Sequence, residues 1–296
     1  MENPLLELQE YENLQEALKK AKGPVQATGT LDSQKVHLMY WLGKDGGFPW
    51  KLVVTYDDQR AREIYDDFRS FTENVWLYPA KDLLFYSADI HGNLITRERL
   101  QVLRHLMEDA GGVVVTTMDG LMDHLLPLAC MKEQVLHLEA GQELDLEAWK
   151  IRLAELGYER MAQVDGMGQF SVRGGILDIY PLTEELPVRI ELWDTEVDSI
   201  RTFDIESQRS IEQLDEIDIY PATEIVLTKK QAKEGVERIR KEAKTFAEKL
   251  RKQGSTEEAY RITRITQELT EGIGEGLTQT GLDAWISYFN KETVSF

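Results

Sequence analysis

The segment from Gly29 to Val36 has the residue spacing that could hold a nucleotide. It reads Gly-Thr-Leu-Asp-Ser-Gln-Lys-Val, close to the phosphate-binding loop G-x-x-x-x-G-K-[ST]. In that loop the second glycine lets backbone N–H groups close on the phosphates, the lysine neutralises phosphate charge, and the hydroxyl binds magnesium. Here Gln34 replaces the glycine, Val36 replaces the hydroxyl residue, and Asp32 adds negative charge near Lys35. We interpret the segment as a degenerate loop and predict no bound cofactor and no nucleotide hydrolysis.

Other residues with catalytic or metal-binding chemistry do not form a recognisable pattern. The five histidines are scattered along the chain, at positions 37, 91, 105, 124 and 137. They show no H-E-x-x-H spacing, and the chain lacks the cysteine partners of a zinc site. Acid pairs such as Asp57-Asp58 fall in turns or on helix surfaces, where solvation explains them. We therefore predict no catalytic residue and no metal site.

The composition indicates which cellular compartment and which binding partners to expect. The single cysteine, Cys130, lies among apolar residues and fits a reducing compartment. No apolar run approaches the ~20 residues that cross a bilayer, and the first residues lack the basic start of a signal peptide. We expect a cytoplasmic protein without a membrane partner. The formal net charge of -19 argues against independent binding to DNA, whose affinity depends on cations that displace counterions from phosphates.

The charge is unevenly distributed, and one stretch is basic. From Lys229 to Arg264 twelve Lys and Arg residues accompany six Glu residues. Apolar residues recur there at three- and four-residue spacing: Val236, Ile239, Ala243, Phe246 and Leu250. This spacing predicts an amphipathic helix over 229–264, whose interleaved charges are typical of a solvated surface. Weak nucleic-acid binding by this basic helix stays open as the alternative function.

The elements around the glycine loop alternate between strands and helices. Strands are expected at residues 25–28, 51–56, 75–78 and 112–117, and helices at 96–107 and 118–126 among others. The runs at 51–56 and 112–117 are expected to be buried on both faces, as in a parallel sheet covered by helices on both sides. The strand at 25–28 would lead into the loop and the next helix. We predict an α/β domain over residues 1–131, with a parallel sheet like that of P-loop nucleotide hydrolases.

The pattern changes after residue 131. A helix over 146–156 is expected to end at Gly157 in a left-handed cap. Short strands follow at 160–164, 169–172, 176–180, 188–193 and 197–203, separated by glycine and proline turns. This spacing predicts an inserted antiparallel α+β domain over 132–221. A helical domain over 222–296 completes the chain, and we expect it to be a truncated part of a longer protein.

The stretch from Gln169 to Arg209 carries a family resemblance. It contains Gln-Phe-Ser-Val-Arg-Gly-Gly-Ile-Leu-Asp-Ile-Tyr-Pro, then Leu-Pro-Val-Arg-Ile-Glu-Leu-Trp-Asp, and ends in Phe-Asp-Ile-Glu-Ser-Gln-Arg. It resembles domain 2 of the excision-repair helicase UvrB, and more closely the matching domain of the bacterial transcription-repair coupling factors (Mfd). Weaker similarity extends to Tyr78–Asp82 and Ile95–Leu100. The whole chain thus resembles the N-terminal UvrB-like module of that family, which consists of domains 1a, 2 and 1b.

The departures from UvrB favour the coupling factors. UvrB has an intact phosphate loop, whereas the module of the coupling factors resembles it without one, as does this chain. Only Leu84–Asn93 separates a strand from the next helix, which is too short for the DNA-gripping hairpin of UvrB. The resemblance implies a non-catalytic module on which the damage-recognition protein UvrA docks. It also implies that the ATPase motor and the contacts with RNA polymerase and DNA belong to other domains of the family's longer chain.

The resemblance maps the family's UvrA contacts onto Arg173, Arg189 and Trp193, where the family usually has Phe at the last position. The residues themselves agree in type. Arg189, Glu191 and Trp193 alternate along one strand and share a face, and Arg and Trp are typical of binding hot spots. In the alternative, Arg173 and Arg189 form internal ion pairs with Glu191 or Asp194, and Trp193 packs beneath a neighbouring domain.

Overall fold

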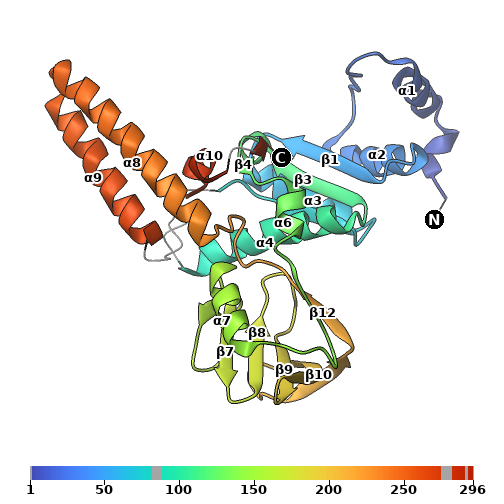
Figure 1. The fold of residues 1–296 in the computed structure, drawn as a ribbon. Helices are drawn as coiled ribbons and strands as arrows, with labels where there is room; N and C mark the ends of the chain where they lie inside the picture. The colour runs from blue at the N-terminus through green and yellow to red at the C-terminus, as the bar shows by residue number, and fades with distance from the viewer. Residues whose placement is uncertain (1, 82–88, 275–281, 291–292, 296) are drawn as a thin grey trace. The chain divides into compact units, whose positions relative to one another are not determined.

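The computed structural model describes residues 2–81, 89–274, 282–290 and 293–295 (Figure 1). Two compact units are distinguished by their internal contacts, one of residues 1–80 with 108–121 and one of residues 81–107 with 122–296. Within the described residues no helix combines the length and apolar character that a membrane span requires. The chain mixes a parallel sheet with antiparallel sheets, which confirms the predicted α/β class at that level.

The first unit contains a parallel three-stranded sheet. Its strands are β1 (Trp50–Thr55), β2 (Val75–Tyr78) and β3 (Gly112–Thr117), in the order β1-β3-β2. Its helices are η1 (Pro4–Glu7), α1 (Gln9–Lys20), α2 (Asp32–Asp45), α3 (Asp58–Arg69) and α5 (Met118–Leu121). The central strand β3 is buried along its whole length. Helices α2 and α3 pack on the sheet through apolar side chains that include Val36, Ile64 and Phe68.

Three expectations for this part of the chain are wrong. Residues 25–28 form no strand, so the glycine loop is not preceded by one. Strand β1 is an edge strand, and Leu52 and Val54 are 52% and 39% exposed, because this unit leaves that face of the strand uncovered. The helix expected over 118–126 ends at Leu121.

The second unit is built on a six-stranded sheet whose strands follow one another in chain order. They are β6 (Glu159–Arg160), β7 (Gln169–Arg173), β8 (Ile176–Tyr180), β9 (Val188–Trp193), β10 (Glu196–Phe203) and β11 (Ser210–Leu214). All neighbours are antiparallel except β6 and β7, which are parallel. The meander is confirmed, although β6 is shorter than expected. Strand β11 was not expected, because its mostly exposed side chains carry no apolar signal.

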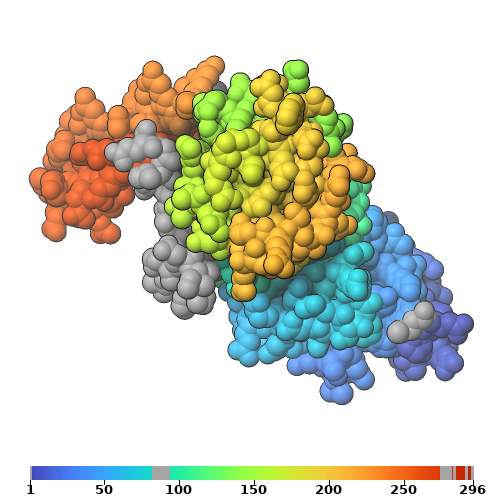
Figure 2. All heavy atoms as spheres, turned by 90° about the horizontal axis from the view of Figure 1, so that it is seen from below, coloured from blue at the N-terminus to red at the C-terminus, as the bar shows by residue number. Residues whose placement is uncertain are grey.

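One face of this sheet packs on α7 (Leu146–Glu155) and forms the largest core of the unit. The carboxylate of Asp145 caps the helix by accepting from the N–H groups of Glu147 and Ala148. Gly157 has a φ of +89°, which confirms the predicted left-handed cap. A two-stranded sheet of β5 (Leu136–Glu139) and β12 (Glu216–Ile219) adds Leu138 and Ile219 to the same core. In the space-filling view β7 to β11 contribute a continuous surface, yellow to gold (Figure 2).

The remaining elements of the second unit are mostly helical. They are α4 (Asp89–Glu108), β4 (His124–Leu125), α6 (Leu128–Lys132), α8 (Lys229–Lys252), α9 (Thr256–Gly274), η2 (Leu282–Trp285), α10 (Ile286–Phe289) and β13 (Val294–Ser295). Helix α4 begins seven residues before the expected position, so the loop predicted there is wrong for residues 89–93, which are helical. Residues 84–88 of the same segment lie outside the described residues.

The single basic helix expected over 229–264 is wrong. Helices α8 and α9 lie side by side as a hairpin (Figure 1), and the chain turns at Gly254, whose φ is +86°. Val236 and Ile239 are buried as the spacing predicted, but Phe246 is 48% exposed and Ala247 takes its place in the packing. The break follows from Gly254, because a left-handed residue ends a helix.

Candidate functional site

The polar side chains of the segment Gly29–Val36 make contacts at the start of α2. At the start of α2 the side-chain oxygen of Gln34 accepts a hydrogen bond from the N–H of Leu31 at 3.1 Å. The ammonium of Lys35 lies 2.7 Å from Asp32, and this bond holds the pKa of the Asp32 carboxyl below its ordinary value. Val36 is buried in the core of the first unit. In this segment Gln34 and Lys35 therefore make contacts within α2, and position 36 carries no hydroxyl.

The same unit contains a cavity of about 440 Å³, which is separate from the segment Gly29–Val36. It is lined by residues at the end of α2, the turn before β1 and the turn before β3, among them Lys44, Phe48 and Asn74. None of its lining residues belongs to the segment Gly29–Val36. The glycine segment therefore does not open into this cavity.

The three predicted docking residues lie on the face of the six-stranded sheet that points away from its core. In β9, Val188 and Ile190 point into the core, so Arg189, Glu191 and Trp193 share the opposite face, as predicted. The register places Arg189 beside Asp178 of β8. The sheet thus brings side chains from β7, β8 and β9 together on one rigid surface.

Both arginines bind one buried carboxylate, that of Asp178. Arg189 donates from Nε to Oδ1 at 2.7 Å and from Nη2 to Oδ2 at 2.9 Å, and Arg173 donates from Nη2 to Oδ2 at 2.8 Å. The Asp178 side chain is 1% exposed. Its carboxylate raises the pKa of Arg189 further above the ordinary value. This acid was missed by sequence analysis, although an acid inside the apolar run Ile-Leu-Asp-Ile-Tyr was a usable signal.

The side chains of the two arginines differ in their exposed fraction. The side chain of Arg189 is 14% exposed, stacks on the ring of Phe203 at 4.4 Å, and also donates to the carbonyl and side-chain oxygens of Gln208. The side chain of Arg173 is 45% exposed. The internal ion pairs considered from sequence thus exist, but with Asp178 in place of Glu191 or Asp194.

Trp193 is the most exposed large apolar residue of this face. It is 80% exposed and does not pack beneath another element of the described chain. It ends β9 directly before the turn at Asp194, whose φ of +58° is tolerated by aspartate. It pairs with Glu196 across the hairpin, and the carbonyl of Thr195 accepts from the N–H of Leu144 at 2.7 Å. An anchored turn therefore holds the tryptophan in solvent.

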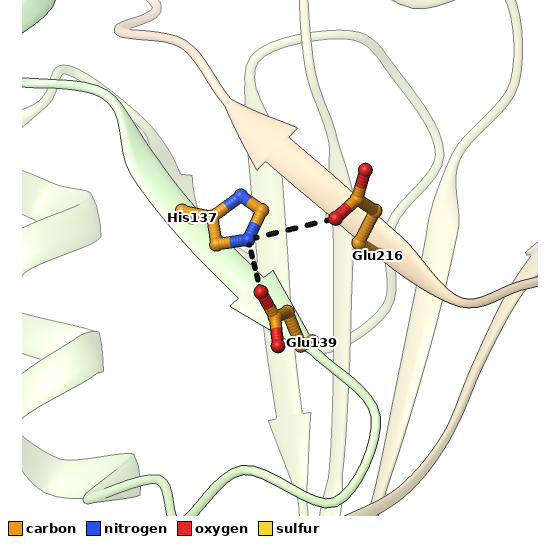
Figure 3. A group of neighbouring side chains, drawn as sticks. All are labelled: His137, Glu139 and Glu216. Carbon is orange, nitrogen blue, oxygen red and sulfur yellow. Dashed lines mark hydrogen bonds and ion pairs between the residues drawn. The ribbon is translucent and has the colours of Figure 1, made fainter.

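A second polar group joins His137 with three acids on the solvent side of β5 and β12, and Figure 3 shows two of these acids, Glu139 and Glu216. The ring Nδ1 lies 2.7 Å from Asp218, and Nε2 lies 3.0 Å from Glu139 and 3.8 Å from Glu216. The carboxylates of Asp218 and then Glu139 raise the pKa of His137. Among the described residues, His137, Glu139 and Glu216 form the group whose ligand atoms come close enough for a metal, all within 4.8 Å of one another. The hydrogen bonds and ion pairs of the imidazole with these carboxylates form an exposed cluster.

A third group is buried and ties distant parts of the second unit together. Arg99 of α4, whose side chain is 0% exposed, reaches Glu224 with Nε at 2.7 Å and Nη2 at 3.0 Å. Its Nη1 lies 2.8 Å from Asp123, and Lys81 lies 3.2 Å from Glu224. Burial alone would raise the pKa of Glu224, but Arg99 and Lys81 outweigh it and hold the pKa below its ordinary value. This group joins the segment after β12 to α4.

Comparisons with known proteins point to one family. The UvrB interaction domain family matches residues 136–225. The transcription-repair-coupling factor of Bacillus subtilis (strain 168) is 34% identical over 246 residues, which are 82% of this chain and 21% of that protein. The factor of Staphylococcus aureus (strain Mu50 / ATCC 700699) is 33% identical over 191 residues, 64% of this chain and 16% of that protein. The chain thus spans about a fifth of the length of these relatives. By sequence it belongs with the N-terminal UvrB-like modules of the bacterial transcription-repair-coupling factors.

Proposed function

We propose that this chain is a non-catalytic docking module that binds the nucleotide-excision-repair protein UvrA. In this proposal residues 132–221 form the docking domain, and Arg173, Arg189 and Trp193 are its interface residues. The module acts within a larger translocase and couples repair to stalled transcription. The observation that carries the proposal is the exposed Trp193 on the same sheet face as Arg173 and Arg189, within the segment that matches the UvrB interaction domain.

The chemistry of this face supports protein binding. Trp193 is 80% exposed, so a large apolar surface is in contact with water. A partner that buries this surface gains binding free energy from the hydrophobic effect. An arginine on the same sheet face can supply bidentate hydrogen bonds to a carboxylate. Both side chains sit on paired strands, so the backbone that carries them is already ordered when a partner binds. Trp and Arg are the residue types that dominate binding energy at protein interfaces.

The contacts at Gly29–Val36 support the non-catalytic part of the proposal. The parallel sheet of the first unit is compatible with a degenerate P-loop fold over residues 1–131, followed after the docking domain by the helical residues 222–296. In the proposal the first unit is a scaffold, since Gln34 and Lys35 are used within α2. The ATPase motor and the contacts with RNA polymerase and DNA are assigned to other domains of the family's longer chain.

The nucleic-acid alternative has less support. Its basic stretch is divided between α8 and α9, so the charges do not form one continuous ridge. Several of them also lie beside acids on the same helix, such as Arg238 near Glu234 at 3.8 Å and Arg264 near Glu268 at 3.5 Å. These are the i,i+4 pairs of a solvated helix surface.

Calorimetric titration of UvrA into the chain tests the proposal. Trp193→Ala is expected to weaken binding by ~1–3 kcal/mol, because it removes the exposed apolar anchor. Tyr260→Ala is the matched control, since this aromatic residue of α9 is 68% exposed and lies outside the docking domain. Failure of the wild-type chain to bind UvrA, or wild-type affinity in Trp193→Ala, would refute the proposal.

A further inference from the structure

We propose that Asp178 is the positioning residue of the docking face, that Arg173 is the arginine it aims at an acidic side chain of the partner, and that Arg189 serves to hold Asp178. The inference rests on the proposed function and assigns separate roles to its two arginines. It follows from how many donors each guanidinium still has available, and from where each lies relative to solvent.

The donors of Arg189 are almost fully used inside the domain. A guanidinium has five N–H groups. Arg189 makes four hydrogen bonds, two to Asp178, one to the carbonyl of Gln208 and one to the side chain of Gln208. The ring of Phe203 covers one face of the guanidinium at 4.4 Å. With its side chain 14% exposed, Arg189 has little left to offer a partner.

Arg173 has the opposite balance. It makes one hydrogen bond, from Nη2 to Oδ2 of Asp178 at 2.8 Å, and keeps its other N–H groups for a partner. It is the last residue of β7, next to the turn at Gly174, and its side chain is 45% exposed. The bond to a carboxylate that is 1% exposed fixes one edge of the guanidinium and leaves the outer edge in solvent.

Asp178 connects the two roles. Its carboxylate is buried and would be costly without cations, so the two bonds from Arg189 are what allow the charge to stay in the sheet. The charge in turn holds Arg173 in one orientation before the partner arrives. An ordered arginine loses less rotamer entropy on binding. The outer edge of Arg173 suits a carboxylate on the partner, next to an apolar surface that would cover Trp193.

The test compares Asp178→Asn, Arg173→Ala, the double variant and the wild-type chain. UvrA affinity is measured by calorimetry, and the rotation of the Arg173 guanidinium is measured by ¹⁵N NMR. Glu237→Gln is the control for the loss of one negative charge, because Glu237 is an exposed acid of α8 and lies outside the docking domain. Arg209, an exposed arginine of the same unit, is the reference for unhindered rotation.

In the wild-type chain Arg173 is expected to rotate more slowly than Arg209, a result that needs no substitution. In Asp178→Asn it should rotate as fast as Arg209, and affinity should fall about two- to tenfold. In the Arg173→Ala background the same change should cost less than about twofold, since the residue through which Asp178 acts is gone. A merely structural role would cost the same in both backgrounds.

Two results would overturn the inference. One is equal rotation of Arg173 and Arg209 in the wild-type chain, and the other is an equal loss of affinity from Asp178→Asn with and without Arg173. A wild-type chain that does not bind UvrA would instead overturn the proposed function and the partner chemistry. In that case the NMR comparison still decides whether Asp178 holds Arg173.

Discussion

Replacing Glu224 by alanine should destabilise the second unit more than a change at any exposed acid. Glu224 accepts two bonds from Arg99, whose side chain is 0% exposed, and lies 3.2 Å from Lys81. Without it Arg99 keeps Asp123 as its anionic partner, at 2.8 Å, and the group changes from two acids and two bases to one acid and two bases. An unbalanced charge stays buried in this position.

The size of the stability loss in Glu224→Ala follows from the burial of Arg99 and Glu224. Removing one partner of a buried ion pair costs ~3–5 kcal/mol, because the remaining charge is not compensated. Glu185→Ala is the matched control, since Glu185 is 84% exposed and pairs with Arg97 at 2.7 Å. Exposed pairs of that kind contribute about 0–1 kcal/mol. A loss of ~3–5 kcal/mol is a large part of the stability of a typical domain, which is roughly 5–15 kcal/mol.

Urea unfolding, followed by hydrogen exchange of the amides in β7 to β9, would measure the effect in the unit that contains Glu224. Because unfolding of a chain with two units need not be two-state, the exchange of these amides is a better measure than a single global signal. The reasoning would be refuted if Glu224→Ala lay within about 1 kcal/mol of the wild type. A double change, Arg99→Met with Glu224→Leu, should lose less stability than Glu224→Ala, since it removes both charges.

Three further predictions concern the other charged groups and the docking face. Arg189→Ala should lower the free energy of unfolding by about 3 kcal/mol, because Asp178 loses its main cation, whereas Trp193→Ala should change it by less than about 0.5 kcal/mol; equal losses in urea titrations would contradict this. His137 has a raised pKa, so its stabilising contact with Asp218 is complete below its ordinary pKa and is lost as pH rises through the folded value. The melting temperature of the wild type should therefore fall relative to His137→Gln as pH rises above the ordinary histidine pKa of 6.5, and parallel curves would disprove that role. Glu224 has a lowered pKa, so its contribution should be present above its ordinary pKa and disappear as pH falls through the folded value, which acid titration of wild type and Glu224→Gln would measure.

Sequence reasoning was accurate where the pattern is local. The alternation along Val188–Trp193 placed Arg189 and Trp193 on one face, and the structure confirms that face. Gly157 was recognised as a left-handed cap from its position after an apolar helix pattern. Such features depend on neighbouring residues alone, so periodicity and turn chemistry are enough to find them.

Sequence reasoning failed where a partner lies far along the chain. Residues 25–28 have the apolar character of a strand, but a strand exists only when another strand pairs with it. The stretch 229–264 has helical spacing throughout, but Gly254 turns it back on itself. The group of Arg99 and Glu224 was missed entirely, since its members are 125 positions apart.

The sequence by itself determined that this chain contains a UvrB-like meander with Arg173, Arg189 and Trp193 in it, and that the segment Gly29–Val36 lacks the glycine and hydroxyl of a phosphate loop. Only the tertiary structure decided which arginine faces solvent. Asp178 lies between the two arginines because β7, β8 and β9 pair in one register, and register depends on packing across the whole sheet. The alternation of residues along a strand determines on which face of the sheet a side chain lies. The exposed fraction of that side chain depends on which other residues of the chain pack against it.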